Sequence, residues 1–231
     1  MFRKFYDTWI QQPQINTFVW VLPCLAFERV YALQKQILLE KLAHPTLPDV
    51  ILITSHPPCY TLGKASSIEE RATRFAFPSH EIERGGHLTF HHPQQVIIYP
   101  IIRLKTRDVR AHLKRVLRWG QKALADLGVG CSLDGQGSGL WLDESHKVAS
   151  VGLAIRRWVS FHGLAINVAV EECMWQDLPK GIYPCALAQS IPTNLCDVKP
   201  ALTCDELIDA LIHVFQQDDA LGTIGLFHKG V

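Results

Sequence analysis

The sequence predicts a single α+β (mixed α/β) domain that covers residues 1–231. Two long segments carry apolar residues at helical spacing, and the part between residues 139 and 170 consists of extended apolar runs separated by polar turn residues. No repeat, low-complexity stretch or Gly/Ser-rich linker marks a domain boundary, and 48% apolar residues suffice for a full core. This mixture of elements favours a sheet with helices on one face over a doubly wound sheet.

The first half of the chain alternates predicted helices and strands. A helix is expected from Glu28 to His44, where two nearby prolines end it, and a longer one from Asp108 to Leu127, where Gly128 closes it. Uninterrupted apolar runs predict short buried strands at 50–54 and 96–104.

The second half is predicted to form a meander followed by a helix. Strands are expected at 140–142, 148–155 and 158–170. Thr203 and Glu206 match a capping box, in which each side chain accepts a hydrogen bond from the backbone N–H of the other residue, so a helix begins there. No GxGxxG or GxxxxGK[ST] sequence indicates a dinucleotide or P-loop site.

Charge and cysteine usage exclude several classes of function. The 23 basic and 22 acidic residues leave a net charge of +1, so no general electrostatic field attracts a nucleic acid or an anionic membrane. The apolar run at 18–27 contains Pro23 and falls short of the ~20 residues that span a bilayer. Seven scattered cysteines without a CxxC pair fit a reducing compartment. We therefore expect a cytoplasmic protein with neither a nucleic acid nor a membrane as its partner.

Four polar segments interrupt the apolar strands and are candidates for one site. Residues 84–93 contain paired glycines and three histidines, 147–152 place a lysine at the head of a strand, 161–167 carry small residues, and 183–186 place a thiol behind a proline. A hairpin turn, a solvated strand end and an inert thiol are the plain alternatives. No Cys, Asp or Glu nearby completes a ligand set with His87, His91 and His92, so no metal is expected.

Taken in order, these segments resemble the lipoyl(octanoyl) transferases, a family with the fold of the catalytic domain of lipoate and biotin protein ligases. The lysine motif is also similar to that of the ligases, whereas the cysteine distinguishes the transferases. The resemblance spans about residues 50 to 190 and rests on His56-Pro-Pro, Tyr60-Thr-Leu-Gly63, Arg84-Gly-Gly, Thr89-Phe-His91, Lys147 to Gly152, Phe161-His-Gly-Leu-Ala165, Asn167 and Pro184-Cys185.

The resemblance implies transfer of an octanoyl group from octanoyl-acyl carrier protein to a lysine of a lipoyl-carrier domain, the first step of endogenous protein lipoylation. The implied acceptors are the lipoyl domains of 2-oxoacid dehydrogenases and the H protein of glycine cleavage. Cys185 and Lys147 form the implied catalytic dyad: the cysteine carries the acyl group as a thioester and the lysine moves protons, without ATP or another cofactor. The implied substrate-binding residues are Arg84, Gly85, Gly86, His87, Leu88, Thr89, Phe90, His91, Ser150, Val151, Gly152, Gly163, Leu164 and Ala165.

One loop departs from the family pattern H-G-P-G-Q, because His92 and Gln94 replace its glycines. If those positions required a positive φ, each side chain would add strain of about 1 to 3 kcal/mol and the accepted acyl length would change. Other functions stay open: an ATP-dependent lipoate or biotin protein ligase, a non-catalytic acyl- or carrier-binding paralogue, and a cysteine hydrolase with His91 or His162 as its base.

Overall fold

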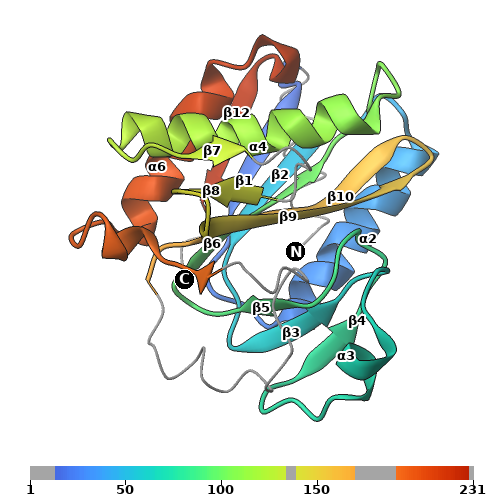
Figure 1. Cartoon of the computed structure of the whole chain (residues 1–231). Helices are drawn as coiled ribbons and strands as arrows, with labels where there is room; N and C mark the ends of the chain where they lie inside the picture. The colour runs from blue at the N-terminus through green and yellow to red at the C-terminus, as the bar shows by residue number, and fades with distance from the viewer. Residues whose placement is uncertain (1–13, 134–138, 170–190, 229–231) are drawn as a thin grey trace.

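A computed structural model describes residues 14–133, 139–169 and 191–228. A large mixed sheet has the strand order β12-β1-β2-β6-β10-β9-β8-β7, with β11 paired to β9, and a small sheet has the order β4-β3-β5 (Figure 1). The strands are β1 Thr17–Val21, β2 Asp49–Thr54, β3 Cys59–Leu62, β4 Ser79–Glu81, β5 Thr89–His91, β6 Gln95–Ile101, β7 Ser132–Leu133, β8 Gly139–Trp141, β9 His146–Arg156, β10 Val159–Asn167, β11 Ile191–Pro192 and β12 Ile224–His228. The helices are α2 Phe27–Ala43, α3 Ile68–Ala72, α4 Val109–Asp126 and α6 Cys204–Gln216, with short 3-10 turns at Leu195–Asp197 and Asp219–Leu221.

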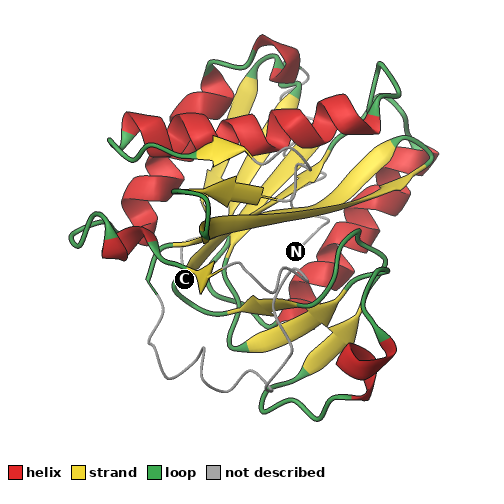
Figure 2. Ribbon diagram, viewed as in Figure 1, coloured by secondary structure: helices red, strands yellow, loops and turns green. Residues whose placement is uncertain are grey.

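Helices cover both faces of the large sheet (Figure 2). On one face, α4 and α6 pack against Val19, Ile51 and Ile98, and on the other α2 packs against the alternating residues, such as Val50 and Leu52. The mixed α/β class is confirmed, but the expectation of helices on a single face is wrong. Strands β1 and β2 are buried on both sides, so each of their faces needs an apolar cover.

The predicted caps of α4 and α6 are confirmed, whereas α2 begins at Phe27 without a side-chain cap. The Asp108 carboxylate accepts a hydrogen bond from the Ala111 N–H at 2.9 Å, and Gly128 takes a positive φ of 76° directly after α4. Thr203 and Glu206 form the predicted capping box at α6. No helix in the described part of the chain is long and apolar enough to cross a membrane.

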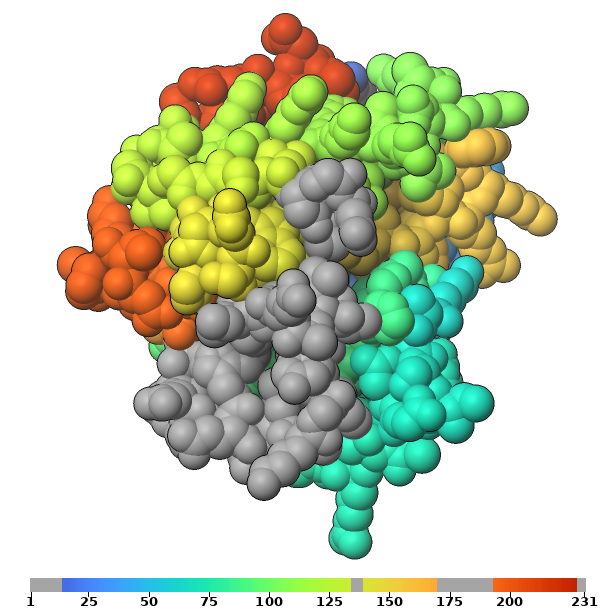
Figure 3. Space-filling model, in the orientation of Figure 1, coloured from blue at the N-terminus to red at the C-terminus, as the bar shows by residue number. Residues whose placement is uncertain are grey.

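The small sheet lies on the α2 side of the large sheet and is followed directly by β6. Its strands are only three or four residues long. An aromatic cluster of its own, centred on Tyr60 and Phe90, holds it together. In the space-filling view this segment lies below the β9–β10 hairpin (Figure 3). The two sheets therefore enclose the space in which the predicted site residues meet.

Candidate active site

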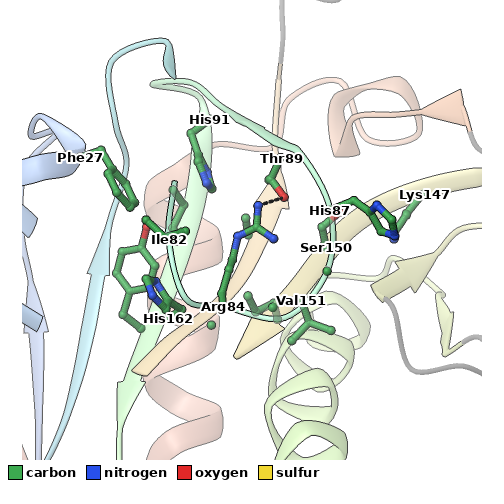
Figure 4. Close-up of a pocket in the computed structure, with 17 residues that line it drawn as sticks. Phe27, Ile82, Arg84, His87, Thr89, His91, Lys147, Ser150, Val151 and His162 are labelled. Atoms are coloured by element: carbon green, nitrogen blue, oxygen red, sulfur yellow. Dashed lines mark hydrogen bonds between the residues drawn. The ribbon is translucent and has the colours of Figure 1, made fainter. Parts of the chain in front are cut away.

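A cavity of about 320 Å³ lies between the large sheet, the small sheet and the start of α2 (Figure 4). Its floor consists of two rows of paired residues, one across three strands and one across two. Ala165 of β10 pairs with Ser150 of β9 on one side and Ile97 of β6 on the other, and Gly163 pairs with Gly152 in the next row. The remaining lining residues are Phe27, Ile82, Arg84, Gly86, His87, Thr89, His91, Tyr99, Lys147, Val151, His162 and Leu164.

Lys147 is a buried lysine at the β9 end of the cavity. An irregularity in the β8–β9 pairing puts it opposite Trp141, whose ring centroid lies 5.4 Å from the Lys147 Nζ atom. A Cβ on Gly139 would lie 1.9 Å from the Ala149 carbonyl oxygen and 2.6 Å from the lysine side chain. Only glycine fits beside this lysine, so the local sequence fixes the path of its side chain.

Arg84 is the buried cation at the centre of the cavity wall. Its Nη2 atom donates to the Thr61 carbonyl oxygen at 2.7 Å and to the hydroxyls of Thr61 and Thr89 at 2.9 Å, and its Nη1 atom donates to the Gly85 carbonyl oxygen. Acceptors on β3 and β5 thus satisfy much of the hydrogen-bonding capacity of the guanidinium. A buried cation is tolerated when it is hydrogen-bonded in this way.

The glycines of the Arg84 loop allow segments of backbone to approach each other. The Gly85 N–H donates to the Leu153 carbonyl oxygen of β9 at 2.9 Å, and a Cβ on Gly152 would lie 2.8 Å from the Gly85 carbonyl oxygen. Gly86 has a φ of 82°, which favours glycine. The loop is therefore held against β9, which brings Arg84 over the same strand that carries Lys147.

A chain of hydrogen bonds starts at Arg84 and crosses to the large sheet. The Thr61 hydroxyl, which accepts from Arg84, lies 3.2 Å from His91 Nε2 and donates to it. His91 Nδ1 then donates to the Gln95 side-chain oxygen at 2.8 Å, because an amide oxygen only accepts. Burial holds the pKa of His91 well below its ordinary value, so the ring is the neutral link that this pattern requires.

The same chain continues to the backbone of Lys147. Gln95 Nε2 donates to the Asn167 side-chain oxygen at 2.8 Å, and Asn167 Nδ2 donates to the Thr193 carbonyl oxygen at 3.2 Å. The Thr193 N–H donates to the Lys147 carbonyl oxygen at 3.1 Å. These hydrogen bonds therefore connect the segments that carry Arg84 and Lys147. They run through Gln95, whose role the sequence analysis missed.

Aromatic and histidine rings form the end of the cavity opposite Lys147. Phe27 lies 5.0 Å from His80, 5.3 Å from His56 and 5.5 Å from Tyr31, measured between ring centroids. The Tyr99 hydroxyl donates to His56 Nε2 at 2.8 Å, and His56 Nδ1 donates to the Leu25 carbonyl oxygen. Burial lowers the pKa of His56 to about 4, so its ring is neutral. This end wall is closely packed, and the polar side-chain atoms of His56 and Tyr99 are hydrogen-bonded.

His162 is a strained residue in the cavity wall, with a φ of 57° inside strand β10. Its N–H donates to the Gln34 side-chain oxygen of α2 at 2.9 Å, and its ring stacks on Tyr31 at 5.4 Å. Burial, with a smaller contribution from Arg84, lowers the pKa of His162 to about 3. Within the described residues its Nε2 atom has no hydrogen-bond partner. A left-handed non-glycine residue inside a strand is unusual and occurs most often at functional sites.

The structure brings together most of the residues predicted for the site. Lys147, Arg84, Gly86, His87, Thr89, His91, Ser150, Val151, Gly152, Gly163, Leu164 and Ala165 line the cavity. Three others do not line it: Gly85 packs on β9, while Leu88 and Phe90 belong to the core of the small sheet. The predicted nucleophile, Cys185, lies outside the described residues. In the described ranges, no group of three or more His, Cys, Asp or Glu side chains could hold a metal ion.

The loop that departs from the family pattern carries no positive-φ strain. Among the described residues, the non-glycine positive φ values belong to Arg107, Arg157, Trp158 and His162, so the strain considered for His92 and Gln94 is absent. His92 is buried and stacks on Phe90, and the Gln94 side chain faces the start of α6. Neither residue lines the cavity, so the suggested effect of these two substitutions on acyl length has no support from its walls.

Several solved structures share this fold. A bipartite lipoate protein ligase from Thermoplasma acidophilum matches with a TM-score of 0.66 and 13% identity over 94% of this chain and 88% of that one. LipL1 of P. falciparum, solved in complex with lipoate, matches with a TM-score of 0.68 and 15% identity over 92% of this chain and 66% of that one. At such identities these matches show the fold alone.

Sequence comparison defines the class. The model of the lipoyl protein ligase A/B catalytic domain matches residues 28–216, so the chain carries a catalytic domain of that class. An octanoyltransferase from Nostoc sp. is 31% identical over 209 residues, which are 88% of this chain and 91% of the relative. Another, from Hyphomonas neptunium, is 35% identical over 183 residues, or 74% of this chain and 76% of the relative. The chain belongs to the octanoyltransferase family and is an acyltransferase of protein lipoylation.

Proposed function

We propose that this enzyme transfers an octanoyl group from octanoyl-acyl carrier protein to a lysine of a lipoyl-carrier domain, through a thioester on Cys185. The observation that carries the proposal is the buried Lys147 amine at one end of a cavity whose other end consists of aromatic rings and neutral histidine rings. Such a cavity suits an alkyl chain with its reactive carbon beside the lysine.

The proposed reaction consists of two acyl transfers. The Cys185 sulfur attacks the thioester carbon of the donor, the carbon–sulfur bond to the phosphopantetheine breaks, and the leaving thiol takes up the proton that the cysteine gave to Lys147. The amine of the acceptor lysine then attacks the Cys185 thioester, forms the amide, loses a proton through Lys147 and releases the cysteine thiol. Nothing is oxidised or reduced, and no ATP is consumed.

The length of the chain permits Cys185 to reach this cavity. The described chain resumes at Ile191, which pairs with His146 next to Lys147. Ile191 comes six positions after Cys185, and six extended residues span at most ~22 Å. The chain length therefore allows Cys185 to lie beside the strand that carries its proposed partner.

The remaining site residues take supporting roles in this proposal. Ser150, Val151, Gly152 and Gly163 to Ala165 lie along the acyl chain, and the Arg84 to His91 segment closes the cavity over it. Leu88 and Phe90 support that segment from the core of the small sheet. The proposal also includes a single catalytic domain over residues 1–231, a cytoplasmic location, and acceptors among the lipoyl domains of 2-oxoacid dehydrogenases and the H protein of glycine cleavage.

The test is the intact mass of the protein after incubation with octanoyl-acyl carrier protein in the absence of ATP. We expect an octanoyl adduct that hydroxylamine removes, its absence in Cys185→Ser, and slower formation in Lys147→Ala. Cys24→Ser, which alters an exposed cysteine outside the cavity, is the matched control and retains the adduct. No adduct on the wild-type protein, with acylation of a lipoyl domain only when ATP and free acid are supplied, would contradict the proposal and favour a ligase.

A further inference from the structure

We infer that the end wall formed by Phe27 and Tyr99 sets the length of the acyl chain that this cavity accepts. The inference rests on the proposed function, in that it takes the cavity as the acyl site, and it identifies the residues that limit the substrate. Because His92 and Gln94 do not line the cavity, the selection of chain length has to come from other side chains.

The direction of the cavity follows from the strand pairing. The row Ser150, Ala165, Ile97 crosses from β9 over β10 to β6 in register, and all three residues line the cavity. Lys147 lies at the β9 end and Phe27 at the other, with Arg84 between them in Figure 4. A chain that starts beside Lys147 therefore runs across the strands toward α2.

The span of this floor matches an eight-carbon chain. Three neighbouring strands cover two gaps of about 4.8 Å, or about 10 Å in all. Seven C–C bonds of about 1.5 Å in an extended zigzag reach about 9 Å. An octanoyl group with its carbonyl above Ser150 would place its last carbon above Ile97 on β6, the strand that also carries Tyr99.

The wall itself is built to resist displacement. Phe27 is 3% exposed and is enclosed by the rings of Tyr31, His56 and His80. Tyr99 is fixed by its hydrogen bond to His56, which in turn is fixed to the Leu25 carbonyl oxygen. A longer chain would have to move Phe27 out of these contacts, because close-packed interiors yield little to one additional methylene.

Two substitutions should move the preference in opposite directions. Phe27→Ala opens the wall, and Phe27→Leu opens it less, so the preferred chain should lengthen from eight to ten carbons in the first and change less in the second. Ala165→Val adds two methyl groups to the middle of the floor and should shorten the preferred chain to six carbons. Burial of two more methylenes corresponds to roughly a tenfold change in the ratio of the two affinities.

The measurement is the affinity of the purified protein for saturated free fatty acids of six, eight, ten and twelve carbons by titration calorimetry. Phe215→Leu is the matched control, because Phe215 is equally buried but packs on α4 at the opposite face of the sheet. We expect it to lose stability and to keep the eight-carbon preference.

A preference that stays at eight carbons in folded Phe27→Ala and Ala165→Val would overturn the inference, as would the same shift in Phe215→Leu. Should Phe27→Ala fail to fold, Phe27→Leu and Ala165→Val decide the matter by their opposite shifts. Failure of the proposed function has a separate signature, the absence of the mass adduct on Cys185, since fatty acid binding does not need that thiol.

Discussion

The part of the sheet formed by strands β6, β10 and β9 has two very different faces. On the α4 side, Ile98, Ile166 and Val148 are completely buried in a continuous apolar core. On the other side, the alternating positions hold Ser150, Gly152, Gly163 and Ala165, small residues beneath a cavity. One face is filled with side chains and the other is left open, although their residues alternate along the same strands.

Residues that stabilise the core and residues that line the cavity therefore occupy alternate positions of the same strands. Successive side chains of a strand point to opposite faces, so a protein can change one face without the other. The filled face supplies apolar burial, and the open face holds polar side chains whose hydrogen bonds are satisfied by each other.

The largest expected effect concerns the glycines of the open face. A Cβ on Gly163 would lie 1.9 Å from the Ile98 carbonyl oxygen of the neighbouring strand, so Gly163→Ala should lower the free energy of unfolding by about 3 kcal/mol or more. Gly85→Ala is the matched control, because its nearest contact would be 3.6 Å, and we expect it to stay within about 1 kcal/mol. Urea unfolding measures the free energy of unfolding of both variants. Equal losses would contradict the prediction, because the close approach of β6 to Gly163 would then not exclude a Cβ.

The fold could be predicted where local signals agree. The spacing of apolar residues and the caps at Asp108 and Thr203 gave α4 and α6, and alternating apolar runs gave the β8–β10 meander. The small sheet could not be predicted, because strands of three or four residues are too short to show a period. Helices on both faces were missed, although the uninterrupted apolar run at 50–54 is typical of a strand that is covered on both sides.

Sequence motifs indicated several residues of the site, but not all of the residues that hydrogen-bond to one another there. Paired glycines and a strand-head lysine mark residues 84–86 and 147 in the sequence. Gln95 and Asn167 were overlooked as members of a hydrogen-bond chain, although a polar residue next to an apolar strand segment is a signal that could have found them. The role of Phe27 has no such signal, because an apolar residue at a helix start is common.

A smaller effect is expected when the hydrogen-bond chain is broken on the open face. Gln95→Leu leaves His91 Nδ1 without a partner in a buried place and removes one hydrogen bond to Asn167, so the free energy of unfolding should fall by about 2 kcal/mol. Gln121→Leu removes a half-buried hydrogen bond between α4 and Cys131 and should cost less than about 1 kcal/mol. Transfer activity should also fall in Gln95→Leu beyond its loss of folded protein. Equal stability losses in the two variants would mean that the chain contributes no more than an ordinary hydrogen bond.

The smallest effect at neutral pH is a pH dependence that should be the same on both faces. Burial lowers the pKa of His112, which lines a separate cavity at the start of α4, from 6.5 to about 4, and burial lowers that of His162 on the open face to about 3. Above pH 6.5 both rings are neutral in the folded and unfolded protein, so neither changes stability. As the pH falls below 6.5, the two histidines take up protons in the unfolded chain but not in the folded protein. The free energy of unfolding therefore falls until the pH reaches the folded pKa.

Each of these histidines should therefore contribute a slope of up to about 1.4 kcal/mol per pH unit between pH 6 and 4.5. His112→Leu and His162→Asn, the second chosen because Asn tolerates a positive φ, should each reduce the slope of unfolding free energy against pH by up to that amount. The double variant should reduce it by the sum, because the two rings lie on opposite faces and share no partner. Urea unfolding across this pH range gives the slopes. An undiminished slope in His112→Leu, with a reduced one in His162→Asn, would show that only the open face keeps its histidine neutral.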